Sequence, residues 1–319
     1  MKLRIVATVL ATAAATGCSA GPMTTSDGPP SGAAATGTAW TPTGELVYGT
    51  LPGDLGDDEF VVPVLYTVNT DGSGGRRLPL SAFGAAWSTD GTRLLANGIP
   101  LSRDDFWPAR PAVVDPDGRI VKLFKLPGMP DEVSNCRWTP DERDLVCDIA
   151  AGVVRIDPAT SRTTMLARGG EDQVWDVAAD GTVVFAHQES SSDGIEDAEL
   201  WTINIDRSGR RQLTEFGEVE GTYDTAGGSW LPDGSAIVTA TPQGKLVKVD
   251  ATTGELTEIP LDEYLFASRP AVSPDGTMIA FEAAADDQDI YVTPIDGGPV
   301  ALVVGTDADE IRPDWRPGA

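Results

Sequence analysis

The chain has 319 residues, is 41% hydrophobic, and carries a formal net charge of −26 because 49 acidic residues outnumber 23 basic ones. This length and apolar content allow a large buried core. The negative charge repels nucleic acid and anionic lipid headgroups, so we expect no nucleic-acid partner, and solubility alone is sufficient to explain the total charge.

Residues 1–17 have the pattern of a secretory signal peptide. Two basic residues precede an apolar run from Ile5 to Ala15 that is too short to span a bilayer. The ending Ala15-Thr16-Gly17-Cys18 resembles the lipobox of bacterial lipoproteins, in which a small residue precedes the cysteine that is lipidated. The resemblance implies an exported lipoprotein, anchored through a palmitate-type lipid on Cys18 to the outer face of the cell membrane. Alternatively, Ala13-Ala14-Ala15 could serve an ordinary signal peptidase, which would give a free secreted protein.

Residues 18–38 are small and polar, rich in Gly and Pro, and show no hydrophobic period. This composition predicts a disordered tether with an end-to-end reach of roughly 25 Å. A lipid on Cys18 would therefore hold a folded head off the membrane surface. No other segment is long and apolar enough to span a bilayer, so we expect membrane contact through the lipid anchor alone.

Residues 39–319 are built on one repeated phrase. Its clearest form, WSTDGTRLLA, starts at Trp87 and predicts the end of a strand, a tight turn and a second strand. Related phrases start at Trp40, Trp138, Val177, Trp230, Val272 and Trp315. The intervals of 39–53 residues between them are typical of a β-propeller, which has one four-stranded blade per repeat.

Each of the six intervals also contains one expected outer hairpin. The hairpins start at Leu65, Pro111, Val153, Leu200, Leu246 and Ile290. Six intervals and six hairpins predict an all-β fold, a six-bladed β-propeller of four-stranded antiparallel blades. We expect the C-terminal strand around Ile311 to Trp315 to pair with the first blade near Glu45 to Gly49, which closes the ring and removes an exposed edge.

The repeats resemble those of TolB-type propellers. The resemblance lies in SPDGTMIAFEA at Ser273, LPDGSAIVTA at Leu231, IYVTPIDGG at Ile290 and WTINIDRSGRRQLT at Trp201. It covers about Trp40 to Pro317 and implies the propeller fold. TolB itself has an α/β domain before its propeller, whereas a tether precedes the repeats here, so the resemblance implies the fold and not a Tol–Pal role.

The longer loops of the expected propeller are rich in acidic residues, with aromatic residues among them. These loops should emerge on one face, because they join the second to the third strand of each blade and one blade to the next. Such a face suits a basic protein segment, a cationic ligand or a sugar-like surface, although polar loops with aromatics packed on the blades would show the same composition. The candidate binding face consists of Asp57, Asp58, Asp104, Asp105, Trp107, Tyr223, Asp224, Arg269 and Arg312.

Arg269 and Arg312 occupy equivalent positions on the innermost strands of two neighbouring blades, three residues before the repeated phrase. Two arginines at a channel mouth could hold a carboxylate or a phosphate. The alternative is structural pairing with nearby loop acids such as Asp309 or Glu310.

Cys136 and Cys147 flank the turn of one repeat and should face each other across its hairpin. In an oxidising, exported compartment this arrangement predicts a cross-strand disulfide. A metal site is the poorer alternative, because the chain offers no second pair of soft ligands.

Catalytic motifs are absent from the sequence. His187 is the only histidine, and the chain has no G-x-S-x-G elbow, P-loop or H-E-x-x-H. We therefore expect a monomeric binding protein without a cofactor, which binds an envelope protein or a small ligand through its acidic loop face. The alternative is an enzyme or small-ligand sensor whose site, Ca²⁺-dependent or metal-free, lies at the channel mouth.

Overall fold

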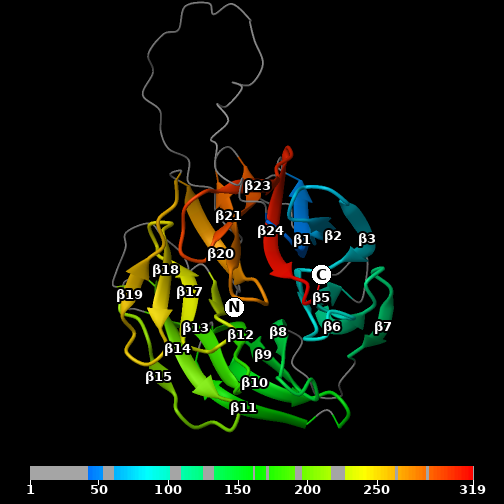
Figure 1. Cartoon of the computed structure of the whole chain (residues 1–319). Helices are drawn as coiled ribbons and strands as arrows, with labels where there is room; N and C mark the ends of the chain where they lie inside the picture. The colour runs from blue at the N-terminus through cyan, green and yellow to red at the C-terminus, as the bar shows by residue number, and fades with distance from the viewer. Residues whose placement is uncertain are drawn as a thin grey trace, which may run out of the picture. The chain divides into compact units, whose positions relative to one another are not determined.

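The computed structural model describes residues 42–52, 61–100, 109–124, 133–160, 162–169, 172–190, 196–216, 227–262, 265–284 and 287–318. These residues form β-strands and turns, and none of them belongs to a helix that could cross a membrane (Figure 1). The expected signal peptide, Cys18 and the tether lie outside the described residues.

The strands form six separate four-stranded antiparallel sheets, which are the blades of the propeller. Blade 1 contains, from the innermost strand outward, β24 (Ala308–Trp315), β1 (Glu45–Pro52), β2 (Val64–Asn69) and β3 (Arg76–Ser81). Blade 2 contains β4 (Gly84–Trp87), β5 (Leu94–Pro100), β6 (Ala109–Val114) and β7 (Ile120–Leu123). Blade 3 contains β8 (Ser134–Trp138), β9 (Leu145–Ile149), β10 (Gly152–Asp157) and β11 (Arg162–Arg168).

The second half of the chain repeats the same order. Blade 4 contains β12 (Gln173–Val177), β13 (Thr182–Ser190), β14 (Glu196–Asn204) and β15 (Arg211–Gln212). Blade 5 contains β16 (Gly228–Trp230), β17 (Ala236–Ala240), β18 (Leu246–Asp250) and β19 (Leu256–Glu258). Blade 6 contains β20 (Phe266–Val272), β21 (Met278–Ala284), β22 (Gln288–Pro294) and β23 (Ala301–Val304). The predicted six-bladed β-propeller is therefore confirmed.

The hydrophobic core lies between the blades. The buried apolar residues fall into six clusters, and each cluster joins two neighbouring blades around the complete ring. One cluster, for example, packs Val47 and Leu65 of blade 1 against Leu94 and Val114 of blade 2. Each blade thus buries both of its faces, which explains why its middle strands are apolar on both sides.

The C-terminal strand closes the ring as predicted. β24 pairs with β1, with Trp315 opposite Leu46 and Ile311 opposite Gly49 (Figure 1). The indole N–H of Trp315 donates a 2.8 Å hydrogen bond to the carbonyl of Ala271 in blade 6. The two ends of the described chain therefore lie in one sheet, and the last strand also contacts the preceding blade.

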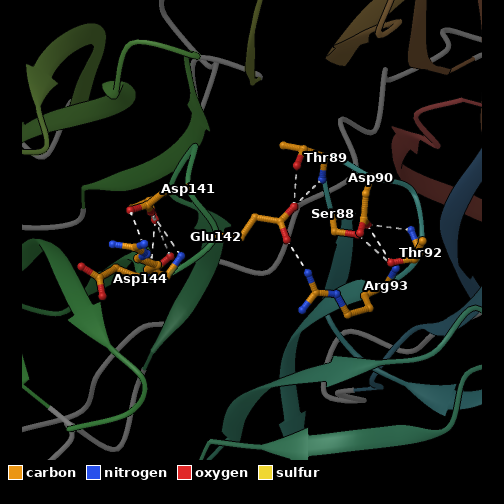
Figure 2. Close-up of polar contacts among 10 residues, drawn as sticks. Ser88, Thr89, Asp90, Thr92, Arg93, Asp141, Glu142 and Asp144 are labelled. Atoms are coloured by element: carbon orange, nitrogen blue, oxygen red, sulfur yellow. Dashed lines mark hydrogen bonds and ion pairs between the residues drawn. The ribbon is translucent and has the colours of Figure 1, made fainter.

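The repeated phrase forms the turn between the two innermost strands of a blade, and an aspartate organises it. In blade 2 the Asp90 carboxylate accepts hydrogen bonds from Ser88 Oγ, Thr92 N and Thr92 Oγ1 (Figure 2). These bonds stabilise the ionised form and lower the pKa of Asp90 to about 2. The Asp in this phrase is thus a turn-forming residue.

Blades 2 and 3 are also joined through their turns. Glu142 adopts a left-handed conformation with φ of 53° in the turn of blade 3, and its carboxylate reaches the turn of blade 2 (Figure 2). There it accepts hydrogen bonds from the backbone N and the Oγ1 of Thr89 and forms an ion pair with Arg93.

The predicted disulfide is present. Cys136 on β8 and Cys147 on β9 are fully buried and bonded to each other, with their Cα atoms 4.1 Å apart. The bond lies where β8 bulges, because the pairing register shifts between Ser134 and Arg137. The sequence predicted the pairing but not this bulge.

Removal of the disulfide should destabilise the propeller. In the Cys136→Ala/Cys147→Ala variant we expect the free energy of unfolding to fall by about 3 kcal/mol, since the crosslink restricts the unfolded chain. Denaturant unfolding of the oxidised protein, the reduced protein and the variant measures the difference. A variant as stable as the oxidised protein would contradict a stabilising role.

Candidate functional site

The structure describes two residues of the predicted binding face. Asp57, Asp58, Asp104, Asp105, Trp107, Tyr223 and Asp224 lie outside the described residues. Arg269 and Arg312 are described, and both lie in the wall of the central channel.

The innermost strands of all six blades line this channel. Its wall includes Gly84, Asn135, Trp175, Gly228, Arg269 and Arg312, one from each blade. The water-accessible volume is about 70 Å³, which is small for an organic ligand. The described channel therefore has room for a few water molecules rather than for a sizeable substrate.

Arg269 and Arg312 both have left-handed backbones, with φ of 43° and 55°. Asn135 and Gly227, at the equivalent position of two other blades, have φ of 38° and 93°. In β20 and β24 a bulge occurs at this point, because the pairing register shifts there. The bulge turns these side chains toward the channel at some cost in backbone strain.

The two arginines are bonded to partners within the wall. The Arg269 guanidinium lies 3.0 Å from the buried carboxylate of Glu282, and Arg312 Nη1 donates a 2.7 Å hydrogen bond to Asn135 Oδ1. The Arg312 side chain reaches Asn135 by passing blade 2 at Gly84, where a Cβ atom would lie 3.2 Å from Arg312 Cδ. Arg312 therefore spans one side of the channel.

These partners differ from the loop acids that we expected. Asp309 accepts a hydrogen bond from the backbone N of Gln288, and Glu310 accepts from Thr306. Asp309 is thus bonded to the start of β22 in blade 6, and Glu310 to the segment just before its own strand. Glu282 is the partner of Arg269 because β21 runs beside β20, with Glu282 opposite Ser268.

A side chain from each blade holds the innermost strand of the next blade. At three junctions the residue immediately before the repeated phrase does this. Asp314 accepts from the backbone N of Trp87 at 2.8 Å, Asp176 from Trp230 at 2.9 Å, and Ser229 from Val272 at 3.0 Å.

At the other three junctions the side chain comes from the second strand of the blade. Asn97 accepts from the backbone N of Cys136 at 3.0 Å, Asp148 from Val174 at 3.0 Å, and Glu282 from Arg312 at 2.6 Å. All six junctions of the ring therefore carry one such bond.

Burial raises the pKa of three aspartates among these six side chains. Desolvation raises the pKa of Asp314 to about 7 and that of Asp148 to about 6, and it also raises the pKa of Asp176. The nearby positive charge of Arg137 opposes this effect at Asp314 and Asp176. The channel thus combines buried acids and arginines that stabilise one another.

A second group of acids lies at the loop ends of blades 6 and 1. Burial raises the pKa of Glu310 and of Asp289, and the negative charge of Asp287 raises both further. Glu310 is 1% exposed and Asp289 is 9% exposed. The pKa of Tyr48 rises to about 12 through burial and through the charge of Glu310. These carboxylates repel one another, so a positively charged partner would stabilise them.

His187 belongs to a buried pair. Its Nδ1 lies 2.5 Å from the Asp172 carboxylate, and its ring packs edge-on against Trp201. Burial raises the pKa of Asp172, and the hydrogen bond to His187 opposes that effect. The pair is packed inside blade 4, which fits the structural role expected for the only histidine.

The described residues contain no group of three or more His, Cys, Asp or Glu side chains placed to hold a metal ion. The acidic loops for which Ca²⁺ binding was considered lie partly outside these residues. Ca²⁺ binding there stays a prediction.

The six side chains that join the blades were not predicted from the sequence. Three of them, Asp176, Ser229 and Asp314, share one position, directly before the aromatic or aliphatic residue that starts the repeated phrase. A polar residue there, between apolar neighbours, was the available signal. The other three, Asn97, Asp148 and Glu282, come from second strands and also share one position, ten residues after Trp87, Trp138 and Val272, which start the phrase in their blades.

Comparisons with known proteins support the fold. No protein-family model and no curated protein matches the chain. Among solved structures, a protein assigned as TolB from Agrobacterium tumefaciens is similar with a TM-score of 0.60 and 14% identity, covering 87% of this chain and 100% of that chain. A chain of a nidogen/laminin complex is similar with a TM-score of 0.56 and 8% identity, covering 82% of this chain and 100% of that chain. The chain is thus a six-bladed β-propeller, and these identities establish the fold alone.

The buried carboxylates predict that the propeller is more stable at mildly acidic pH. Because folding raises the pKa of Asp314, the folded state keeps this proton between about pH 4 and pH 7 while the unfolded chain releases it. The free energy of unfolding therefore falls as the pH rises through this range. We expect the melting temperature at pH 5 to exceed that at pH 7.5 by about 3–6 °C.

The Asp314→Asn variant tests this assignment, because the amide keeps an acceptor for Trp87 N but carries no proton to release. We expect it to melt higher than the native protein at pH 7.5 and to lose part of the pH dependence. The control is Glu255→Gln, which removes the same charge at an exposed site. Equal pH dependence in both variants would contradict the role of Asp314.

Proposed function

We propose that this protein is an exported lipoprotein of the cell envelope whose propeller binds a partner protein through its acidic loop face. The fold and its TolB-like neighbour fit an interaction module in general terms. The lipid anchor is supported by the residues around Cys18, and the acidic face by the loop sequences.

The observation that carries the proposal is the repulsion among Asp287, Asp289 and Glu310 at the loop ends of blades 6 and 1. Each of the last two carboxyls has a pKa raised by burial and by acidic neighbours. A lysine or arginine from a partner would lower this repulsion, so the described part of the face favours a basic segment. The acidic loops beside it would extend the same field and speed association.

The channel is a weaker candidate for the site. It holds about 70 Å³, and Arg269 and Arg312 are bonded to Glu282 and Asn135. A small-ligand sensor or enzyme at the channel mouth would have to bind above these arginines, among the loops. Both the partner-binding site and the alternative small-ligand or enzyme site would therefore lie on the loop side of the propeller.

Lipidation can be tested directly. When cells that express the full-length protein are given a labelled fatty acid, we expect the label on the native protein and none on the Cys18→Ala variant. Cys136 and Cys147 are not competing acceptors, because they form a disulfide. A Cys18→Ala protein that still carries label and sediments with membranes would contradict the anchor.

The acidic face can be tested by reversing its charge. We expect Asp57→Lys/Asp58→Lys to reduce crosslinking and pull-down of envelope proteins by the propeller about tenfold or more, because charge complementarity is lost. The control is Asp71→Lys/Glu255→Lys, which makes the same charge change on exposed turns of the opposite face. Equal losses in both variants, or capture unchanged in the first, would contradict the proposal.

A further inference from the structure

A basic side chain joins the outer turns of neighbouring blades at three junctions of the ring. These turns connect the third strand of a blade to its outermost strand. Arg76 of blade 1 donates to the Pro116 carbonyl of blade 2 at 2.7 Å. Arg211 of blade 4 donates to the carbonyls of Ala251 and Thr252 in blade 5. Lys248 of blade 5 lies 2.6 Å from Asp296 of blade 6.

The junction between blades 3 and 4 has the same kinds of residue but a different arrangement. Arg162 starts the outermost strand of blade 3, as Arg76 and Arg211 do in their blades. Within the described part of the chain, its guanidinium makes no hydrogen bond or ion pair with the turn of blade 4. A hollow of about 200 Å³ separates the two turns instead. It is lined by Asp144, Arg155, Asp157, Arg162, Thr164, Ile205, Asp206 and Arg207.

The acids in this hollow are already hydrogen-bonded. Asp144 pairs with Arg155 at 2.5 Å. Asp157 accepts from Ala159 N, Thr160 N and Thr160 Oγ1. Asp206 accepts from the N and Oγ of Ser208.

Arg162 and Arg207 form no such direct contacts with these acids, although the positive charge of Arg162 contributes to lowering the pKa of Asp157. Neither guanidinium has a carboxylate within ion-pair distance among the described residues, although three carboxylates line the same hollow. Two arginine side chains that share a cavity and keep their donors available are suited to a bidentate oxyanion.

The backbone of Arg207 gives an independent indication. Its φ is 77°, in the left-handed region that favours glycine. The equivalent turn of blade 1, which also runs from Asn through Asp to a paired Arg, has Gly72 at this place with φ of 80°. Arginine therefore occupies a position where glycine would relieve strain, and Arg207 lines the hollow.

We propose that the hollow between the outer turns of blades 3 and 4 binds a small oxyanion, a carboxylate or phosphate group, through Arg162 and Arg207. The site lies on the face opposite the acidic loops, since it is built from turns at the other ends of the strands. It is therefore a second binding site, separate from the proposed interaction face. Its volume suits a phosphate or a short dicarboxylate rather than a nucleotide.

Titration calorimetry and thermal melting of the full chain test the proposal with two probes, inorganic phosphate and succinate. Sodium chloride at equal ionic strength controls for screening of the acidic surface. At about ten times its Kd, a probe should raise the melting temperature by about 2–4 °C over chloride. The two probes distinguish phosphate from carboxylate as the preferred group.

The variants Arg162→Ala and Arg207→Gly should each lower the affinity for the probe at least tenfold. Arg207→Gly should also melt higher than the native protein by about 1–3 °C, because glycine relieves the backbone strain. The matched control is Arg76→Ala, which removes an outer-turn arginine that is already bonded, and it should bind the probe like the native protein.

No heat and no shift with either probe would overturn the proposal. So would equal binding by the native protein and Arg207→Gly, or equal loss in Arg76→Ala. The acidic-face charge reversal leaves this site intact, so failure of one proposal is distinguishable from failure of the other.

Discussion

The ring depends on one kind of interaction, a side chain of each blade that accepts a hydrogen bond from the innermost strand of the next. That strand is the edge of its sheet, so part of its backbone N–H groups have no partner within the blade. The narrow channel leaves little room for water to satisfy them. Asn97, Asp148, Asp176, Ser229, Glu282 and Asp314 supply the six acceptors, one at each junction. Apolar packing between the blades provides the bulk of the stability, and these bonds set how the innermost strands are placed around the axis.

These hydrogen bonds place carboxylates at the channel wall, where little water can solvate them. The arginines of the channel supply the compensating positive charge. Buried acids destabilise a fold unless opposite charge or hydrogen bonds compensate. Arg137 acts on Asp176 and Asp314, Arg269 on Glu282, and Arg312 on Asp148. The two arginines that the sequence marked as possible ligand holders are therefore part of the structure of the ring. Ligand binding is consequently expected outside the channel, on the loops and turns.

The sequence was sufficient to predict the features of the fold that arise from the repeat or from residues close together in one hairpin. The phrase at Trp87 and its copies predicted six blades, the pairing of Ile311 to Trp315 with Glu45 to Gly49, and the disulfide of Cys136 with Cys147. It was not sufficient for contacts between blades, because these depend on how one sheet lies against the next. Arg269 was expected to pair with Asp309 or Glu310, which belong to the innermost strand of the next blade, whereas its partner Glu282 lies in the same sheet. The bulges that turn Arg269 and Arg312 toward the channel also had no signal in the repeat, since Gly, Asn, Val and Arg all occupy that position.

The acidic residues behind the net charge of −26 have different surroundings in the turns and at the loop ends of the propeller. Aspartates in the turns, such as Asp90, Asp157 and Asp233, have pKa values lowered chiefly by hydrogen bonds from neighbouring Ser, Thr and backbone N–H groups. Acids at the loop ends, such as Asp289 and Glu310, have pKa values raised by burial and by the negative charge of neighbouring acids. Local hydrogen bonds thus satisfy these turn aspartates, whereas Asp289 and Glu310 lie close to other acids at the described loop ends. The two proposals rest on this contrast: an oxyanion held by Arg162 and Arg207 on the turn face, and a cationic partner on the loop face.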